Sequence, residues 1–547
     1  MSKTVIIGGV AAGATAAARL RRLDEDMEII ILEKGSYISY ANCGLPYYIG
    51  GVIKDREALL IQTPESMRSR YRLDVRTRQQ AIKIDPEAKT VQVKKKDGTI
   101  YEESYDQLII ATGSSPYKPN IPGIDSEGIY TLWTVPDTDA IYQRIEKERI
   151  KRVTVIGGGF IGLEMAENLQ ERGLDVTLIE VTSQVMPPLD MDMAGFLHEH
   201  ISKKGVHLYT GASVTGFEKK KKGLSIYLAN GEEISADMVL LSIGVRPNSK
   251  IAREAGILLG DRGGIKVDEY MRTSEPDIWA VGDVAEIKNL VTGNPAMIPL
   301  AGPANKQGRI AANDICQLDG ETYDGSLGTS VVKIFDLTAA SVGINEKMLR
   351  SDGKLKGKDY EVVLINQKSH ATYYPGAKSM ILKLIFTMEG QILGAQIVGL
   401  EGVDKRIDTI ATVMRMKGSV RDLEKLELSY APPFSSAKDP VNMAGYVADN
   451  ILKGLVSFVM PTELTKDMAL VDVREDWEVA GEDMTGIFHI PLGQLRERIN
   501  GLPKDRTLVI RCGVGVRAYN AARILMQNGF GSVKVLAGGM SFFKSPF

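Results

Sequence analysis

Residues 4–13 read TVIIGGVAAG, and this stretch decides the fold of the first part of the chain. Its apolar run predicts a strand over 4–7, and the alanine-rich segment that follows predicts a helix that ends at about Leu23. A second apolar run, 28–32, ends at Glu33, 20 positions after Gly13. Glycines let the backbone approach a pyrophosphate at the helix N-terminus, and a carboxylate at the second strand end accepts ribose hydrogen bonds. We therefore predict a dinucleotide-binding βαβ unit, although Val10 replaces the middle glycine of G-x-G-x-x-G.

The same unit recurs further along the chain. A strand is predicted over 152–156, residues 157–162 (GGGFIG) fit G-x-G-x-x-G fully, and a strand over 175–179 leads to Glu180. Two such units about 150 residues apart are a far more specific signal than one. A carboxylate at the second ribose position favours NADH, because it would repel the 2′-phosphate of NADPH.

Bulk composition narrows the class of protein. From its length of 547 residues we expect three or four domains. Its contents of 44% hydrophobic and 25% charged residues are typical of a globular protein. A net charge of −2 argues against nucleic-acid binding. No run approaches the roughly 18–20 apolar residues of a membrane span, so we expect no membrane association. Three widely spaced cysteines and an N-terminus that enters a strand directly, with no signal-peptide pattern, predict a cytoplasmic protein.

Two further motifs carry a family resemblance. Residues 108–113 (LIIATG) predict a strand that ends at a small-residue turn, and residues 273–283 (TSEPDIWAVGD) predict a strand that ends at Gly282 and Asp283. With the two nucleotide units, they resemble the flavoprotein reductases of the pyridine nucleotide-disulfide oxidoreductase superfamily. The resemblance implies FAD, with Asp283 on its ribitol; taken alone, Asp283 could also be a helix N-cap.

The resemblance also implies a set of cofactor-binding residues: Gly8, Gly9, Ala12, Gly13, Glu33, Lys34, Ala111, Thr112, Gly113, Gly157, Gly159, Phe160, Ile161, Gly162, Glu180, Gly244, Gly282, Asp283 and Ala301.

The remainder of the chain reads as two more domains. Strands are predicted over 331–334, 361–365, 379–386 and 391–398, and helices from Arg406 and Lys438. Composition alone indicates an α+β domain. The resemblance implies that it is a homodimerisation domain that completes the partner's active site. A linker is predicted over 452–463. The tail, with strands over 470–472, 507–511 and 532–536 and a helix from Ala518, resembles a rhodanese (sulfurtransferase) domain.

The predicted fold is therefore α/β, with two Rossmann-like nucleotide-binding domains, an α+β dimerisation domain and a rhodanese-like α/β domain. Its expected boundaries are 1–115 and 250–325 for FAD, 116–249 for NAD(P)H, 326–452 for dimerisation and 463–547 for the rhodanese-like domain.

Cys43 is the candidate redox residue. It lies in a turn of sequence SYANCGLPYY, residues 39–48, and no second cysteine is near it. A lone thiol cannot form an internal disulfide, so its oxidised form is a sulfenic acid or a mixed disulfide; the alternative is a buried structural cysteine. The segment is very similar to coenzyme A-disulfide reductases, whose single cysteine carries CoA. Val10 stands where the related peroxidases have a histidine, which argues against that branch.

A CoA ligand needs cations for its phosphates. Arg19 and Arg22 are three residues apart on the first helix and are expected to share a face, although a solvated helix surface would show the same spacing. The resemblance implies these CoA-binding residues: Thr15, Arg19, Arg22, Ser39, Asn42, Asn305 and, from a partner subunit, Lys438. It also implies that Tyr430 and either Tyr373 or Tyr374 face the sulfur, where a phenol can protonate a departing thiolate.

Cys512 is a second candidate sulfur site. Residues 512–517 (CGVGVR) form a loop that enters a helix, where successive backbone N–H groups make an anion cradle that stabilises a thiolate or persulfide. Arg517 closes the ring, and Ala518 stands where rhodaneses often have serine. The alternative is a structural strand–helix turn. Cys316, in an apparent helix, is expected to be inert.

Together these features predict an FAD-dependent enzyme that uses NADH (or NADPH) to reduce CoA disulfide, CoA persulfide or polysulfide. Electrons would pass through the flavin to Cys43, and Cys512 would handle sulfane sulfur; no metal is expected. Two alternatives remain open: an NADH oxidase or peroxidase with a Cys43 sulfenic acid, and a non-catalytic sulfur relay or sensor.

Overall fold

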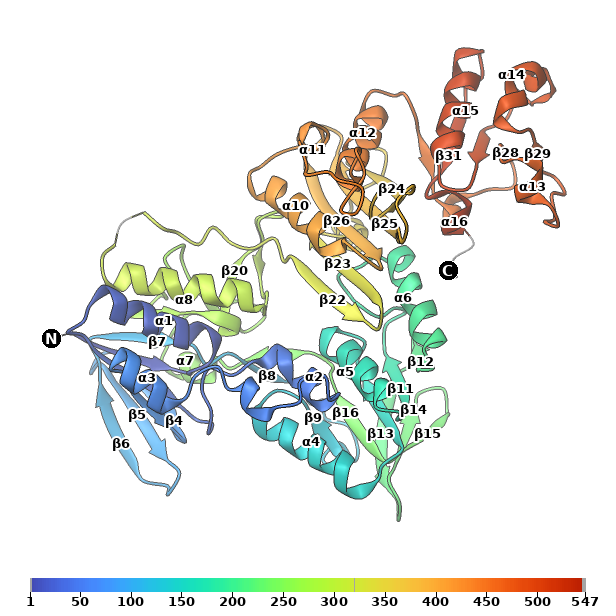
Figure 1. Cartoon of the computed structure of the whole chain (residues 1–547). Coiled ribbons are helices and arrows are strands. Elements are labelled where there is room, and N and C mark those ends of the chain that lie inside the picture. Colours follow the sequence, from blue (N-terminus) through green and yellow to red (C-terminus); the bar gives the residue numbers. More distant parts are fainter. Residues whose placement is uncertain (1, 319, 544–547) are drawn as a thin grey trace. The chain divides into compact units, whose positions relative to one another are not determined.

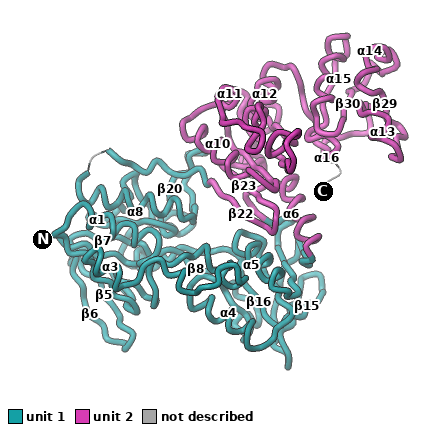
Figure 2. The backbone as a smooth tube through the Cα atoms, in the orientation of Figure 1, with its two compact units in different colours: residues 1–185, 205–328 teal, residues 186–204, 329–547 magenta. Residues whose placement is uncertain are grey.

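The computed structural model describes residues 2–318 and 320–543. The chain forms two compact units, residues 1–185 with 205–328, and residues 186–204 with 329–547 (Figure 2). Within the described residues, no helix combines the length and the apolarity that crossing a membrane requires.

The first unit contains a five-stranded parallel sheet in the order β19-β7-β1-β2-β3. Its strands are β1 (Lys3–Ile7), β2 (Glu28–Glu33), β3 (Asp74–Thr77), β7 (Gln107–Ile110) and β19 (Ile278–Ala280). Helix α1 (Ala11–Leu23) packs along α8 (Ala301–Ile315), as Figure 1 shows. Four of the six alanines of α1 are buried, and their small side chains let the two helices lie close together. The N-terminal βαβ prediction is therefore confirmed.

A second five-stranded parallel sheet, β12-β11-β10-β16-β9, repeats this arrangement. Its strands are β9 (Ile129–Thr131), β10 (Arg152–Ile156), β11 (Asp175–Glu180), β12 (His207–Thr210) and β16 (Met238–Leu241). Helix α5 (Phe160–Glu171) follows β10 as α1 follows β1. Two antiparallel sheets accompany the parallel pair: β4 (Gln79–Asp85), β5 (Thr90–Lys95) and β6 (Ile100–Ser104), and β13 (Val214–Lys219), β14 (Leu224–Leu228) and β15 (Glu233–Ala236).

The second unit begins with an antiparallel sheet in the order β22-β23-β26-β25-β24. Its strands are β22 (Ser330–Ile334), β23 (Leu337–Gly343), β24 (Tyr360–Lys368), β25 (Ser379–Thr387) and β26 (Ile392–Gly399), and its helices are α9 (Glu346–Ser351), α10 (Val403–Arg415), α11 (Val420–Lys425) and α12 (Pro440–Leu452). Helix α6 (Met191–Lys203) belongs to the same unit and is joined to the sheet by ion pairs of Lys383 with Asp190 and Asp192.

Two predicted helix starts are wrong by a few residues, for local reasons. Helix α10 begins at Val403 rather than Arg406, because Gly402 adopts the left-handed conformation (φ 71°) and starts the helix there. Helix α12 begins at Pro440 rather than Lys438, because Asp439 caps it: the Asp439 side chain accepts a hydrogen bond from the backbone N–H of Val441.

The C-terminal residues form a parallel sheet in the order β27-β31-β30-β28-β29. Its strands are β27 (Phe458–Val459), β28 (Ala469–Asp472), β29 (Phe488–His489), β30 (Leu508–Arg511) and β31 (Val533–Leu536), and its helices include α13 (Asp476–Val479), α14 (Leu495–Arg498), α15 (Val516–Gln527) and α16 (Gly539–Phe543). The prediction of a linker over 452–463 is wrong in part. Strand β27 lies within that range and pairs with β31, because its apolar residues extend the edge of this sheet.

Candidate functional site

The two glycine turns have nearly identical backbone geometry. Gly8 and Gly157 follow the first strand of each unit with φ of 106° and 107°, a region that side chains other than glycine rarely adopt. A Cβ on Gly13 would lie 1.9 Å from the carbonyl oxygen of Gly8, and one on Gly162 would lie 1.8 Å from that of Gly157. These glycines therefore let each helix start directly against its strand.

The N-termini of α1 and α5 are open to an anion. Within the described residues no side chain caps either helix, and neither has an acidic residue in its first turn. By contrast, α3 (Pro64–Tyr71) and α4 (Val135–Glu148) in the same unit carry complete capping boxes from Thr63 and Thr134. Free backbone N–H groups and a positive helix dipole suit a pyrophosphate, so both turns fit a dinucleotide.

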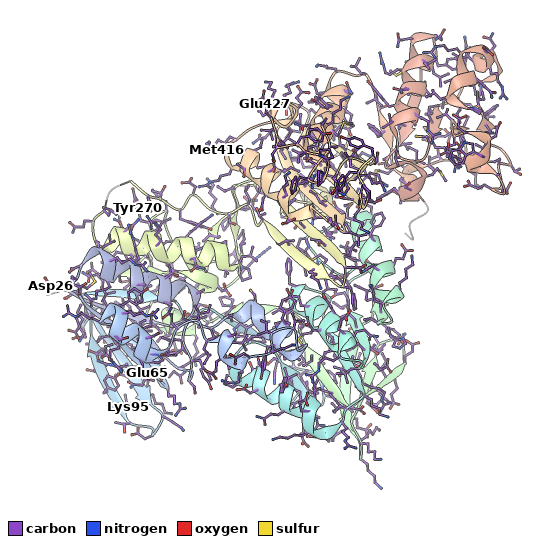
Figure 3. All side chains as sticks on the ribbon, viewed as in Figure 1. Asp26, Glu65, Lys95, Tyr270, Met416 and Glu427 are labelled. Carbon is purple, nitrogen blue, oxygen red and sulfur yellow. The ribbon has the colours of Figure 1, made fainter. Side chains whose placement is uncertain are left out.

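An acidic residue occupies the same position in each turn. The carboxylate of Glu33 accepts a hydrogen bond from the backbone N–H of Gly9 at 3.0 Å, and that of Glu180 accepts from Gly158 at 2.7 Å. Both glutamates are buried at the end of the second strand. Beside Glu33, Lys34 lines a cavity of about 370 Å³ with six more residues. Those residues are Ser36, Arg78, Gln80, Lys94, Lys95 and Lys96, of which Lys95 is labelled in Figure 3.

The turn at 111–113 and Asp283 belong to one polar network. Ser114 donates from its hydroxyl to the Asp283 carboxylate at 2.8 Å, and burial raises the pKa of that carboxyl although this hydrogen bond opposes the shift. The backbone N–H of Gly282 donates to Gln307 on α8 at 2.7 Å. Thr112 donates from its hydroxyl to the backbone carbonyl of Asn248 at 2.9 Å. The predicted strand-end motifs therefore meet at the carboxyl edge of the first sheet.

The other predicted cofactor residues lie on the same turns and helices. Ala12 is buried in the first turn of α1, Phe160 and Ile161 start α5, and Ala301 starts α8. Gly244 (φ 98°) accepts a hydrogen bond from the backbone N–H of Tyr117 at 2.9 Å.

Cys43 lies in a short 3-10 helix, Asn42–Gly44, that leads into α2 (Leu45–Ile49). Its side chain is open to solvent. Partial burial by the surrounding protein raises the pKa of its thiol, and the negative charges of Glu164 and Asp283 raise it further. An exposed cysteine in a turn is accessible to a substrate, which favours the redox interpretation of Cys43 over that of a buried structural cysteine.

Glu164 and Tyr47 are neighbours of Cys43 that the sequence prediction missed. The Tyr47 hydroxyl donates to the Glu164 carboxylate at 3.5 Å. Burial and the charge of Glu167 raise the pKa of Glu164 to about 7, with Tyr47 partly offsetting the shift. The only sequence signal for this pair was an acidic residue two positions after the last glycine of the second turn.

Three residues of α1 that were predicted to bind CoA contact different neighbours. Thr15 donates from its hydroxyl to Asn305, across the α1–α8 contact. Arg19 donates to Asn313 of α8 at 2.8 Å, whereas Arg22 stacks over the ring of Tyr71 at 5.4 Å. The two arginines, three residues apart on α1, therefore contact different partners, and their joint binding of CoA stays a prediction.

Ser39 and Asn42 lie on the segment that carries Cys43. Ser39 has a positive φ of 43° and donates its backbone N–H to the carbonyl of Gly9 at 2.8 Å. Asn42 donates to the backbone carbonyl of Trp133 at 3.4 Å. The Cys43 turn is therefore tied directly to the first glycine turn.

In the second unit, Tyr373 and Tyr430 meet through their hydroxyls, whereas Tyr374 packs edge-on against His370. Buried Arg406 joins the loops that carry the two tyrosines. It donates to the backbone carbonyl of Ser369 at 2.8 Å and pairs with Asp439 at 2.9 Å.

Lys438 is exposed immediately before Asp439. Because the Tyr373 hydroxyl meets that of Tyr430 while Tyr374 packs against His370, Tyr373 is the partner of Tyr430.

The loop 512–517 has the cradle geometry predicted from its sequence. The buried Cys512 sulfur accepts hydrogen bonds from the backbone N–H groups of Gly515 at 3.2 Å and Ala518 at 3.3 Å. Gly515 has a φ of 109° and starts α15, so the helix starts at Val516 rather than at Ala518 as predicted. Arg517 closes the ring, but it is held by Glu478, which the sequence prediction missed.

These turns and the two cysteine sites define a flavin- and pyridine nucleotide-dependent oxidoreductase with a sulfurtransferase-like extension. Three family descriptions match the chain: pyridine nucleotide-disulphide oxidoreductase over residues 2–308, its dimerisation domain over 329–440, and a rhodanese-like domain over 461–545. The chain belongs to the pyridine nucleotide-disulphide oxidoreductase family.

Individual relatives agree with this assignment. A coenzyme A disulfide reductase of Staphylococcus aureus (strain JH9) is 39% identical over 450 residues, which are 82% of this chain and 100% of the relative. The crystal structure of reduced CoADR-RHD from Bacillus anthracis is 48% identical with a TM-score of 0.96, covering 100% of this chain and 98% of that one. A NAD-dependent persulfide reductase from A. fulgidus is 39% identical with a TM-score of 0.93, covering 99% of this chain and 100% of that one.

Proposed function

We propose that this enzyme uses NADH to reduce CoA disulfide and CoA persulfide at Cys43. The observation that carries the proposal is an exposed cysteine on a segment that is hydrogen-bonded to the first glycine turn, with both other cysteines far from it in sequence. The similarity to a coenzyme A disulfide reductase and to a persulfide reductase supports this substrate class.

In the proposed reaction Cys43 forms a mixed disulfide with CoA, and its reduction releases a thiol. FAD, when bound, would supply a two-electron carrier between the nicotinamide and the Cys43 sulfur. For the disulfide, CoA–S–S–CoA, NADH and H⁺ give two CoA–SH and NAD⁺. For the persulfide, CoA–S–SH, NADH and H⁺ give CoA–SH, H₂S and NAD⁺.

Other side chains of the chain prepare this step. Thr15, Arg19, Arg22, Ser39, Asn42 and Asn305 would hold CoA, with the arginines on its phosphates. Tyr373 and Tyr430 would hydrogen-bond or protonate the departing thiolate, since a phenol can do both. Glu180 would select NADH, because its ionised carboxylate repels a 2′-phosphate.

The active enzyme is proposed to be a homodimer in which the tyrosines and Lys438 serve the partner's Cys43. A dimerisation domain match over 329–440 supports this, as do exposed aromatic side chains such as Tyr373 and Phe434. We also propose the domain boundaries that were predicted from the sequence. Cys512 would accept sulfane sulfur, in the loop that Arg517 would close.

The decisive experiment is anaerobic turnover of the full chain with NADH and either CoA disulfide or CoA persulfide. Cys43→Ser should lower kcat by at least about a hundredfold, because the nucleophile is lost, whereas Cys316→Ser should match the wild type. NADH absorbance and released sulfide are the readouts. Full turnover in Cys43→Ser would refute the mechanism.

The same assay separates the alternative functions. NADH consumption only with oxygen or peroxide would establish the oxidase or peroxidase, and no consumption with any acceptor would favour a relay. Reductant should also release CoA from the purified wild type, and Cys43→Ser should carry none.

A further inference from the structure

The arginine of the Cys512 loop is engaged by a carboxylate from another element. Both terminal nitrogens of Arg517 donate to the Glu478 carboxylate, the second at 2.7 Å, in a bidentate pair. The guanidinium lies against the loop, since one of its nitrogens is 3.6 Å from where a Cβ on Gly513 would be. Hydrogen bonds from Arg517 lower the pKa of Glu478 to about 2, so this carboxylate is ionised at neutral pH.

Arg517, paired with Glu478, is the one side-chain cation of residues 512–517. Residues 513–516 are glycine and valine only. The cradle therefore stabilises negative charge through the backbone N–H groups of Gly515 and Ala518, which both point at the Cys512 sulfur. This arrangement suits a single sulfur anion and has no second donor set for a distant anionic group.

Exposed apolar side chains lie in the loop and beside Glu478. Val514 and Val516 are 47% and 54% exposed, and Trp477, which directly precedes Glu478, is 78% exposed. Exposed apolar side chains around a buried nucleophile match an uncharged organic tail better than a small hydrated anion.

We propose that Glu478 is a specificity-determining residue that, by holding Arg517, makes Cys512 accept sulfane sulfur from organic persulfides with an uncharged tail and reject dianionic donors such as thiosulfate. The inference rests on the proposed function only in taking Cys512 as a sulfur acceptor, and it adds the donor class and the residue that selects it.

The transfer step is balanced without any further reactant. The Cys512 thiolate attacks the outer sulfur of R–S–SH, the S–S bond of the donor breaks, and the proton moves from the outer sulfur to the leaving thiolate, giving Cys512–S–S⁻ and R–SH. The backbone N–H groups then stabilise the terminal sulfur anion. With thiosulfate the leaving group is sulfite, a dianion that needs a cation beside the loop, and Arg517 could serve it only by breaking its pair with Glu478.

The test is thiocyanate formation by the full chain with cyanide as acceptor and no NADH. The donors are pantetheine persulfide, whose tail is uncharged, and thiosulfate. Glu478→Gln should raise kcat/KM for thiosulfate by about tenfold or more, because a guanidinium is released toward the anion. The same substitution should change kcat/KM for pantetheine persulfide by less than about threefold. Retained persulfide turnover also shows that the variant is folded.

Two more variants complete the design. Asp476→Asn removes an exposed charge from the same short helix and should leave both donors as in the wild type. Glu478→Gln with Arg517→Met should lose the gain with thiosulfate, because the released cation is gone. An unchanged donor preference in Glu478→Gln, or loss of both activities, would overturn the inference. Since the assay needs neither NADH nor Cys43, a failure of the reductase mechanism would leave this result unaffected.

Discussion

At the scale of single residues, the protonation of Cys43 depends on its neighbours. Partial burial, Glu164 and Asp283 all raise the pKa of its thiol. Glu164 itself has a pKa of about 7, so its charge appears as the pH rises through neutrality. The proximity of Glu164 therefore opposes formation of the Cys43 thiolate most strongly above pH 7.

Glu164→Gln should lower the pKa of Cys43, because it removes the second-largest cause of the upward shift. Alkylation of Cys43, followed by mass spectrometry against pH, should move to lower pH in the variant. Glu171→Gln, at the exposed end of the same helix, is the matched control. A profile that moves to higher pH, or does not move, would show that Glu164 does not act on the sulfur.

At the scale of elements, one buried cation holds α6 and α9 to the sheet of the second unit. The Lys383 ammonium is 1% exposed and lies 3.0 Å from Asp190, 2.7 Å from Asp192 and 2.7 Å from Glu346. Burial opposes its charge, but these three carboxylates outweigh burial and raise the pKa of Lys383. These buried ion pairs therefore connect residues 186–204 to strand β25.

Lys383→Met should destabilise the protein by about 3–5 kcal/mol, because it leaves three buried carboxylates without their cation. Chemical denaturation at neutral pH measures this change, with exposed Lys358→Met as the control. The loss should shrink as the pH falls and the orphaned carboxylates protonate in the variant. A loss below about 1 kcal/mol, the size expected of a surface pair, would contradict the buried role.

At the scale of the whole molecule, the two sulfur sites draw their contacts from separate sheets in separate units. Cys43 depends on the glycine turn and α5 of the first unit, and Cys512 depends on the loop before α15. Each site has its own positioning groups, so the chemistry of one should survive loss of the other.

Cys512→Ser should keep NADH-dependent reduction of CoA disulfide within about twofold of the wild type, because the described neighbours of the two sulfurs have no residue in common. The same variant should form no thiocyanate from pantetheine persulfide. Parallel assays of both activities on one preparation, beside Cys316→Ser, are the measurement. If disulfide reduction fell with Cys512→Ser, the two sites would be coupled in that reaction.

The sequence alone determined the features that a few neighbouring residues encode. The two glycine turns, the acidic strand ends Glu33 and Glu180, and the cradle at Cys512 follow from local backbone geometry, so their positions were predicted correctly. Only the tertiary structure decided the pairs Tyr47–Glu164, Lys383–Asp192 and Glu478–Arg517, whose members lie 117, 191 and 39 positions apart. It also brought the Tyr373 hydroxyl to that of Tyr430 and placed β27 inside the predicted linker. The physical reason is that a turn is set by the φ values of its own residues, whereas a side-chain pair depends on how distant elements pack.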